Sequence, residues 1–321
     1  MTRMQLVVIG NGMAGMRTVE ELLQLAPDKY DITVIGREPH GNYNRIMLSP
    51  VLAGEKAFED IVIHPLSWYA ERGITLLAGH TVTGVDRVQR SVTTDQGVVV
   101  GYDRLLLATG SVPFMIPMPG HDHPDVISFR DIADVRRMLE PSAMLPRVVV
   151  LGGGLLGLEA ANGLVKQGMA VTVVNDAAYL LNRQLDEEAS SLLRAALEAK
   201  GIVFQVSAVT SHISHNADTG KLNALHFKDG TELPCDLLVM AVGVRPNVAL
   251  ARSIGLQVDK AILVNDTMQT FDPRVYAVGE CVQHRGALFG LVAPLYDQAK
   301  VCANHLAEMG ISRYEQKPTA T

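Results

Sequence analysis

The chain opens with the stretch MQLVVIGNGMAG, residues 4–15. Its apolar run reads as a buried strand, and a helical stretch from Met16 to Leu25 and a second strand from Asp31 to Ile35 complete a βαβ unit. Glycines at the strand-to-helix turn have the spacing G-x-G-x-x-G and are Gly10, Gly12 and Gly15. Such a turn aims a helix N-terminus at a pyrophosphate and leaves the backbone open to it. A single copy is also compatible with a plain turn.

The same pattern recurs in the middle of the chain. Arg147 to Leu151 reads as a strand, Leu158 to Gln167 as a helix and Ala170 to Val174 as the next strand. The loop between the first two reads GGGLLG, with Gly152, Gly154 and Gly157 at the same spacing. This internal duplication argues against a plain turn and predicts two dinucleotide-binding units.

Three further strands end on small residues, at 102–110 (YDRLLLATG), 235–243 (CDLLVMAVG) and 275–279 (VYAVG), and residues 295–309 have helical periodicity. Proline follows the first two, where the chain leaves a domain. A chain of 321 residues also exceeds one ordinary core. We therefore expect an α/β protein of two Rossmann-like, three-layer dinucleotide-binding domains, one inserted in the other. The outer domain is predicted to comprise residues 1–115 plus 247–321, and the inserted domain residues 116–246.

The bulk composition excludes several classes of function. A net charge of -6 offers no basic surface for nucleic acid or an anionic membrane. The first apolar run is too short for a signal peptide or a membrane span, and the widely separated Cys235, Cys281 and Cys302 form no disulfide or zinc pattern. The ten histidines show no ligand spacing, so we expect no metal site. A cytoplasmic protein is the expectation.

Two nucleotide sites in one chain imply two bound dinucleotides. Hydride transfer from a nicotinamide to a flavin is the chemistry that pairs them most naturally. The protein then has to hold both pyrophosphates and stack the two rings, and needs no acid–base triad. We therefore expect an enzyme that uses FAD and NAD(P)H, with the NAD domain inserted in the FAD domain. The predicted FAD-binding domain is the outer one, residues 1–115 plus 247–321, and the NAD(P)H-binding domain is the inserted one, residues 116–246.

Blocks of residues along nearly the whole chain resemble the pyridine nucleotide-disulfide oxidoreductase superfamily. They are residues 10–15, 43–49 (YNRIMLS), 108–111 (ATGS), 152–160, 242–247 (VGVRPN) and 276–281 (YAVGEC). Within it, residues 10–15, 152–161, 183–186 (RQLD) and 289–294 (FGLVAP) are most similar to the N-terminal part of the NAD(P)H-dependent nitrite reductase large subunit.

The resemblance implies a set of FAD contacts. Gly10, Gly12 and Gly15 would hold the pyrophosphate, Glu38 or its neighbour Arg37 the adenosine side, and Arg45 the phosphates. Thr109 with Gly110 would make a backbone contact. Gly279 and Glu280 stand where relatives have Gly-Asp, so the longer glutamate is a departure that can be bridged by water. Further implied contacts are Met13, Ala14, Val82 and Ala108.

It also implies an NAD(P)H site. The implied contacts are Gly152, Gly154, Leu155, Leu156, Gly157, Asn175, Asp176, Val242 and Gly243. Many NADH-using relatives have a glutamate where this chain has neutral Asn175, and Asp176 follows it. Because Asp176 would repel a 2′-phosphate, we favour NADH over NADPH, although Asn175 could itself occupy the ribose position. Glu159 resembles the family's residue near the nicotinamide carboxamide, and is the candidate catalytic residue; its alternative reading is a solvated helix carboxylate.

Residues 42–50, which correspond to the flavin-facing stretch of the disulfide-containing relatives, hold no cysteine, so we expect no thiol relay. The resemblance implies that electrons pass to a siroheme or iron-sulfur nitrite reductase module in nitrate assimilation. No ligand pattern for such a module is present, and residues 312–321 resemble the start of a following segment, so we expect a truncated chain or a reductase-only one. A reductase of rubredoxin, ferredoxin or assimilatory nitrate reductase, and a non-enzymatic FAD and NADH sensor, are the alternatives. A homodimer is an open possibility.

Overall fold

The computed structural model describes residues 3–140 and 146–316, so residues 317–321 of the C-terminal stretch considered above lie outside it. The chain forms two compact units. Unit 1 comprises residues up to Asn44, Val62–Val112 and the chain from Pro246 onward; unit 2 comprises Arg45–Ile61 and Pro113–Arg245.

Unit 1 is built on a parallel sheet with the strand order β21-β9-β1-β2-β5. Its strands are β1 (Met4–Ile9), β2 (Tyr30–Gly36), β5 (Thr75–Ala78), β9 (Arg104–Leu107) and β21 (Val275–Ala277). The near-continuous apolar runs MQLVVI and RLLL suit strands that are covered on both faces. The order of strands reverses between β1 and β9, and open α/β sheets bind ligands beyond the carboxyl ends of their strands at such a point.

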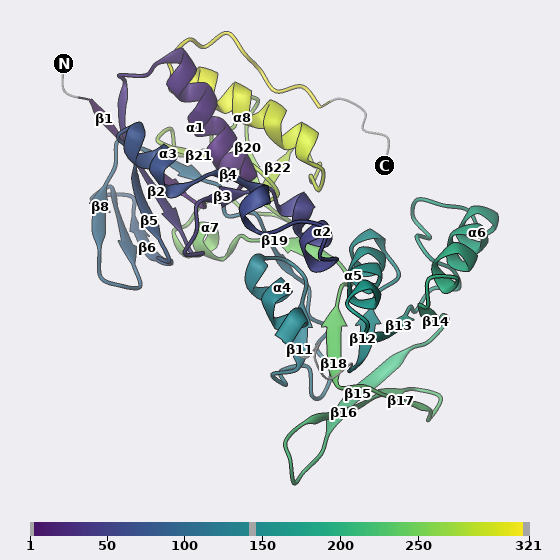
Figure 1. The fold of residues 1–321 in the computed structure, drawn as a ribbon. Coiled ribbons are helices and arrows are strands. Elements are labelled where there is room, and N and C mark those ends of the chain that lie inside the picture. Colours follow the sequence, from purple (N-terminus) through teal and green to yellow (C-terminus); the bar gives the residue numbers. More distant parts are fainter. Residues whose placement is uncertain (1–2, 141–145, 317–321) are drawn as a thin grey trace. The chain divides into compact units, whose positions relative to one another are not determined.

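Alternate side chains of this sheet enter two different cores. Val8, Val34 and Leu106 pack with helices α1 (Met13–Leu25) and α8 (Val292–Leu306), which lie side by side on one face (Figure 1). The neighbouring Val7 and Leu105 join the other core with Val92 of the antiparallel meander β6 (Val82–Asp86), β7 (Ser91–Thr94) and β8 (Val99–Gly101). Unit 1 therefore has three layers: helices, parallel sheet and meander.

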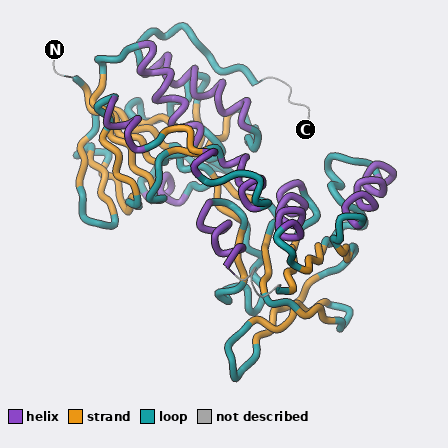
Figure 2. The backbone as a smooth tube through the Cα atoms, viewed as in Figure 1, coloured by secondary structure: helices purple, strands orange, loops and turns teal. Residues whose placement is uncertain are grey.

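Unit 2 repeats this plan. Its parallel sheet has the order β11-β18-β12-β13-β14, with β11 (Val126–Ser128), β12 (Arg147–Leu151), β13 (Ala170–Val174), β14 (Val203–Gln205) and β18 (Leu237–Met240). One face packs on the meander β15 (Thr210–His215), β16 (Leu222–Phe227) and β17 (Glu232–Pro234) through Leu225 and Phe227. Its helices include α4 (Ile132–Leu139), α5 (Leu155–Lys166) and α6 (Glu187–Glu198). Figure 2 shows the strands of this second meander, β15 to β17, joined by loops.

The stretch Arg45–Ile61 packs with Pro113–Arg245, although residues Val62–Val112 of unit 1 separate the two segments in the sequence. It contains the 3-10 turns η1 (Arg45–Met47) and η2 (Glu59–Ile61) and helix α2 (Leu48–Leu52). Leu52 is fully buried, and a Cβ on Gly163 of α5 would lie 2.9 Å from its Cγ. The side chain of Gln167 also donates to the carbonyl of Leu52 at 2.9 Å. The compact units thus differ from the predicted domain boundaries, which place residues 45–61 in the FAD domain.

The remaining elements of unit 1 are short. They are β3 (Asn42–Tyr43), β4 (Val62–His64), α3 (Leu66–Glu71), α7 (Ala249–Ser253), β20 (Ile262–Val264) and β22 (Val282–His284), and β10 (Ser111–Pro113) and β19 (Val244–Pro246) lie where the chain passes between units.

Both predicted βαβ units are confirmed, and β12 and β13 have the predicted bounds. Helices α1 and α5 begin three residues earlier than predicted, at Met13 and Leu155. The reason is that Gly12 and Gly154 themselves occupy the N-cap positions, so the glycine loop ends inside the first helical turn.

Candidate dinucleotide-binding sites

The first glycine loop lies between the carboxyl ends of β1 and β9. The amide of Gly10 donates to the carbonyl of Ile35 at 2.8 Å, and that of Ala108 donates to Ile9 at 2.8 Å. Gly10 has φ +113°, and a Cβ there would lie 2.1 Å from the carbonyl oxygen of Ala108. A Cβ on Gly15 would lie 2.8 Å from the Cβ of Ala108. These two glycines are therefore needed for the turn and for close packing of helix against strand.

The second loop has the same construction in unit 2. The amide of Gly152 donates to Val174 at 2.8 Å, and that of Ala241 donates to Leu151 at 2.8 Å. Gly152 has φ +121°, and a Cβ there would lie 2.5 Å from the carbonyl oxygen of Ala241. A Cβ on Gly157 would meet the carbonyl oxygen of Gly152 at 2.0 Å.

The middle glycine of each loop is different, because a Cβ on Gly12 or Gly154 would meet no protein atom within 4 Å. Neither has a positive φ, so neither the backbone conformation nor the packing of the fold requires glycine there. Each caps a helix whose first amides lack partners within the helix. Open space before a helix N-terminus fits a pyrophosphate, so the residues present fit the dinucleotide that each loop implies.

A polar network holds the first loop. Asn11 accepts a hydrogen bond from the Tyr69 hydroxyl at 2.7 Å and donates to the carbonyl of His40 at 3.1 Å. The side chain of Asn42 donates from Nδ2 to the carbonyl of Asn11 at 3.0 Å. Behind it, His64 is almost fully buried between Asn42 and the carboxylate of Glu20, the latter 2.8 Å away. Burial raises the pKa of Tyr69 to about 12, so its hydroxyl stays a donor to the loop at neutral pH.

Other predicted FAD contacts of unit 1 follow the strands β9 and β21. The hydroxyl of Thr109 donates to the carbonyl of Asn247 at 2.8 Å, and Gly110, at φ +65°, accepts from the amide of Asn247 at 2.9 Å. Gly279, at φ +95°, follows β21, and a Cβ on it would lie 3.2 Å from the Cβ of Ala14. The carboxylate of Glu280 accepts from the Ser111 hydroxyl at 2.8 Å.

The adenosine-side candidates lie after β2. The carboxylate of Glu38 accepts from the Tyr43 hydroxyl at 2.6 Å, and Arg37 beside it is exposed. Met13 is the first residue of α1, and Val82 begins β6 and packs against the meander-side core. Arg45 belongs to unit 2, where its guanidinium donates to the carbonyl of Arg130 at 3.1 Å.

In unit 2, the candidates Leu155 and Leu156 form the first turn of α5, while Val242 and Gly243 follow β18. Gly243 has φ +117° and open space at its Cβ position. Asn175 and Asp176 follow β13 but have different surroundings: Asn175 is buried and its amide bonds to backbone groups, whereas Asp176 is exposed.

The candidate catalytic residue Glu159 lies on the exposed side of α5. Its carboxylate accepts from the Ser49 hydroxyl of α2 at 2.6 Å, within unit 2. Glu159 is therefore oriented by the stretch Arg45–Ile61. Sequence reasoning gave Ser49 no role, because the contact joins residues 110 positions apart.

The cysteines are buried thiols. Burial raises the pKa of Cys235 to about 12 and also raises the pKa of Cys281 and Cys302. Among residues 3–140 and 146–316, no cluster of three or more His, Cys, Asp or Glu side chains is suited to a metal ion. Within the same ranges, no helix has both the length and the apolar character needed to cross a bilayer.

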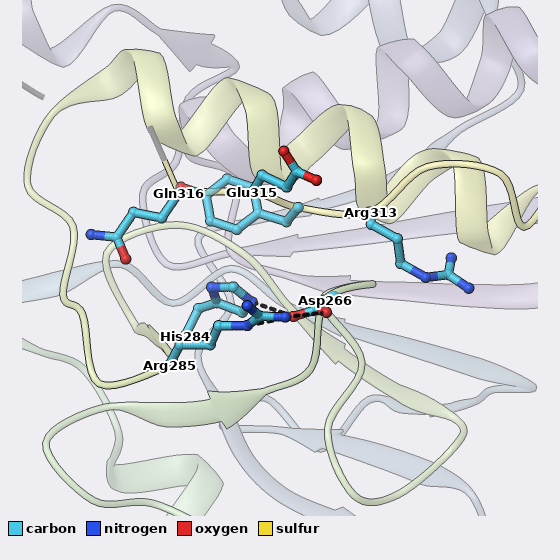
Figure 3. Close-up of a pocket in the computed structure, with 7 residues that line it drawn as sticks. Asp266, His284, Arg285, Arg313, Glu315 and Gln316 are labelled. Atoms are coloured by element: carbon cyan, nitrogen blue, oxygen red, sulfur yellow. Dashed lines mark hydrogen bonds and ion pairs between the residues drawn. The ribbon is translucent and has the colours of Figure 1, made fainter. Parts of the chain in front are cut away.

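A cavity of about 390 Å³ lies elsewhere in unit 1, beside the C-terminal segment (Figure 3). Arg285 and His284 both point to Asp266, whose carboxylate accepts from Arg285 at 2.6 and 3.0 Å and from His284 at 2.8 Å. These hydrogen bonds hold the pKa of Asp266 below its usual range, led by those from Arg285. No glycine-loop residue lines this cavity, so it is separate from both glycine loops.

Residues 4–305 match the family described as pyridine nucleotide-disulphide oxidoreductase. The chain belongs to this family. It is 48% identical over its whole length to the nitrite reductase [NAD(P)H] of Bacillus subtilis, and 45% identical over 98% of its length to the assimilatory nitrate reductase electron transfer subunit of the same organism. It spans 40% of the length of each of these relatives. A ferredoxin reductase structure from Rhodopseudomonas palustris superposes with a TM-score of 0.89 at 28% identity, over 98% of this chain and 78% of that one.

Membership confirms the fold class of two Rossmann-like domains, and the chain is an oxidoreductase of a family that uses FAD and NAD(P)H. The individual contact residues, and the unit that holds each cofactor, stay predictions. Sequence reasoning missed Asn11, Asn42 and Tyr69. No local pattern signals them, because Asn42 and Tyr69 lie 31 and 58 positions from Asn11 in the sequence.

Proposed function

We propose that this chain is the NAD(P)H-oxidising flavoprotein module of a nitrite reductase. In this proposal, FAD binds at the first glycine loop, in unit 1, and NAD(P)H binds at the second glycine loop, in unit 2. The observation that carries the proposal is the pair of open glycine positions, Gly12 and Gly154, at the same point of two sheets with the same plan. The similarity to the Bacillus subtilis nitrite reductase supports the choice of partner.

Bound FAD would supply the conversion between a two-electron hydride donor and one-electron acceptors. The chain's own residues bind and orient. The helix N-termini after Gly12 and Gly154 would hold the pyrophosphates, and Glu280 and Glu38 are the carboxylates that would bind FAD. Glu159, held by Ser49, is the carboxylate that we assign to orienting the nicotinamide carboxamide. The reducing compartment that the separated thiols suit is the cytoplasm.

The partner can be tested with two chimaeras. In one, this chain replaces the matching part of the Bacillus subtilis nitrite reductase [NAD(P)H]; in the other, it replaces that of the nitrate reductase electron transfer subunit. We expect NADH-dependent nitrite consumption by the first chimaera and weak coupling to nitrate reductase by the second. Efficient nitrate reduction by the second with an inactive first would overturn the choice of partner.

An assay of the isolated chain tests whether it is an enzyme or a non-enzymatic sensor. With ferricyanide as acceptor, we expect rapid, continuous oxidation of NADH by protein that releases FAD on denaturation. Stoichiometric binding of NADH without turnover would instead support a sensor. Release of FMN, or of no flavin, would contradict the cofactor assignment.

A further inference from the structure

The two glycine loops can be aligned residue by residue through their backbone hydrogen bonds. Gly10 donates to Ile35 just as Gly152 donates to Val174. The residue after the first glycine is therefore Asn11 in one loop and Gly153 in the other. The residue that follows the acceptor, Ile35 or Val174, is Gly36 in unit 1 and Asn175 in unit 2. Asparagine and glycine have exchanged places between the two units.

In unit 1 the amide comes from the glycine loop. Asn11 donates from Nδ2 to the carbonyl of His40, four residues after Gly36, at 3.1 Å. Gly36 has to be small because a Cβ on it would lie 2.8 Å from the Cβ of Asn11.

In unit 2 the amide comes from the strand end. Asn175 donates from Nδ2 to the carbonyl of Tyr179, again four residues further on, at 3.1 Å, and to that of Ala177 at 3.2 Å. Its Oδ1 accepts from the amide of Gly153 at 3.1 Å. A Cβ on Gly153 would lie 2.9 Å from the Cγ of Asn175. In both units, therefore, an asparagine side chain donates to the equivalent carbonyl. The asparagine lies in the glycine loop of unit 1 and at the strand end of unit 2.

These contacts leave Asn175 little capacity for a ligand. Both amide hydrogens are donated to backbone carbonyls, and the residue is 9% exposed. The loop it ties down is closed further by the amide of Leu181, which donates to the carbonyl of Gly153 at 3.0 Å. Both backbone polar groups of Gly153 are therefore bonded by the loop that follows β13.

We infer that Asn175 is a positioning residue for the nicotinamide dinucleotide: it fixes the loop of residues 176–181 against the second glycine loop and does not read the ribose itself. Selection between NADH and NADPH then falls to exposed residues of that loop, Asp176 first. The inference rests on the proposal that unit 2 binds NAD(P)H. It revises the expectation that Asn175 could occupy the ribose position.

A swap of the two residues tests it. Asn175→Gly removes the amide, and Gly153→Asn alone forces a side chain against Asn175. We expect each single variant to raise the dissociation constant for NADH roughly ten- to a hundredfold, since each disturbs several backbone bonds. The double variant recreates the arrangement of unit 1. It should return to within about threefold of wild type, which is a strong coupling in a double-mutant cycle. Additive losses in the double variant would overturn the inference.

A carboxylate at position 175 separates positioning from ribose binding. Asn175→Asp would set an oxygen against the carbonyls of Ala177 and Tyr179, so we expect weaker NADH binding with an unchanged limiting rate of flavin reduction. Tighter NADH binding with greater discrimination against NADPH would show that residue 175 faces the ribose, and would refute the inference.

The outcomes stay distinct from failure of the proposed function. Flavin content, which depends on unit 1, serves as the control. It should be equal in the four proteins of the swap, which are wild type, the two single variants and the double variant. If the wild-type protein bound neither NADH nor NADPH, the proposed function would be wrong. The melting temperatures of the same four proteins would still report whether the swap restores the loop, and non-rescue there would count against the exchange itself.

Discussion

A valine at position 154 should separate nucleotide binding from folding. Gly154 has φ −84° and ψ 178°, which valine adopts readily, and its Cβ position is free of protein atoms. Valine is a poorer N-cap than glycine, at a cost of about 1 kcal/mol or less, and its lower entropy in the unfolded chain offsets about 0.4 to 1 kcal/mol of this. The free energy of unfolding should therefore stay nearly unchanged.

The binding loss should be much larger. The added methyl groups stand in front of the first amides of α5, including those of Leu155 and Leu156. Losing two hydrogen bonds to a charged pyrophosphate costs about 3 to 6 kcal/mol, from about 1.5 to 3 kcal/mol each. That corresponds to a rise of about 10² to 10⁴ in the dissociation constant for NADH.

The assay is anaerobic stopped-flow reduction, which follows the flavin absorbance at increasing NADH concentration. Gly12→Val is the matched control, since Gly12 has φ −88°, ψ 178° and the same open Cβ position. It should lose FAD while unit 2 stays folded. The reasoning is refuted if Gly154→Val is reduced by NADH as readily as wild type, or if both variants lose FAD equally.

Three further results are expected. Asp176→Ala should lower the preference for NADH over NADPH in kcat/KM about tenfold, the lower end of a ten- to hundredfold range because Asp176 is exposed and screened; an unchanged ratio would contradict its role. Thiol reagents at mildly alkaline pH should leave the native cysteines unmodified and label them only in denaturant, because burial raises their pKa values; rapid labelling of native protein would contradict this (Cys235, Cys281 and Cys302). The lowered pKa of Asp266 adds stability that is fully present above the unfolded value of about 3.9 and is lost as pH falls through the folded value, so Asp266→Asn should flatten the decline of the melting temperature in acid; parallel declines for both proteins would count against the Asp266 cluster.

The features that sequence could predict are those that depend on local pattern. Apolar runs such as MQLVVI followed by spaced glycines define both the strand and the turn, and the duplication made the reading specific. The glycine roles also follow from local geometry: Gly10 and Gly152 have the positive φ that the turn demands.

The features that escaped prediction depend on contacts distant in sequence. Nothing near Leu52 shows that it will pack on Gly163, so the affiliation of residues 45–61 required the fold. Similarly, the role of Asn175 depends on a carbonyl four residues on and an amide twenty-two residues back. A neutral residue at a strand end looks like a weakened ribose ligand until these partners are known.

The packing of α2 on α5 also bears on how such proteins can be recombined. An exchange of nucleotide domains that cuts only near residues 113 and 245 would separate Leu52 from Gly163, and Glu55 from its ion-pair partner Lys166. In the transferred piece, the surface of α5 at Gly163 would lose the leucine that covers it. Unit 2 is therefore made of two segments that are separate in the sequence. A graft of this unit that is meant to change the preference between NADH and NADPH should carry residues 45–61 along with 113–245.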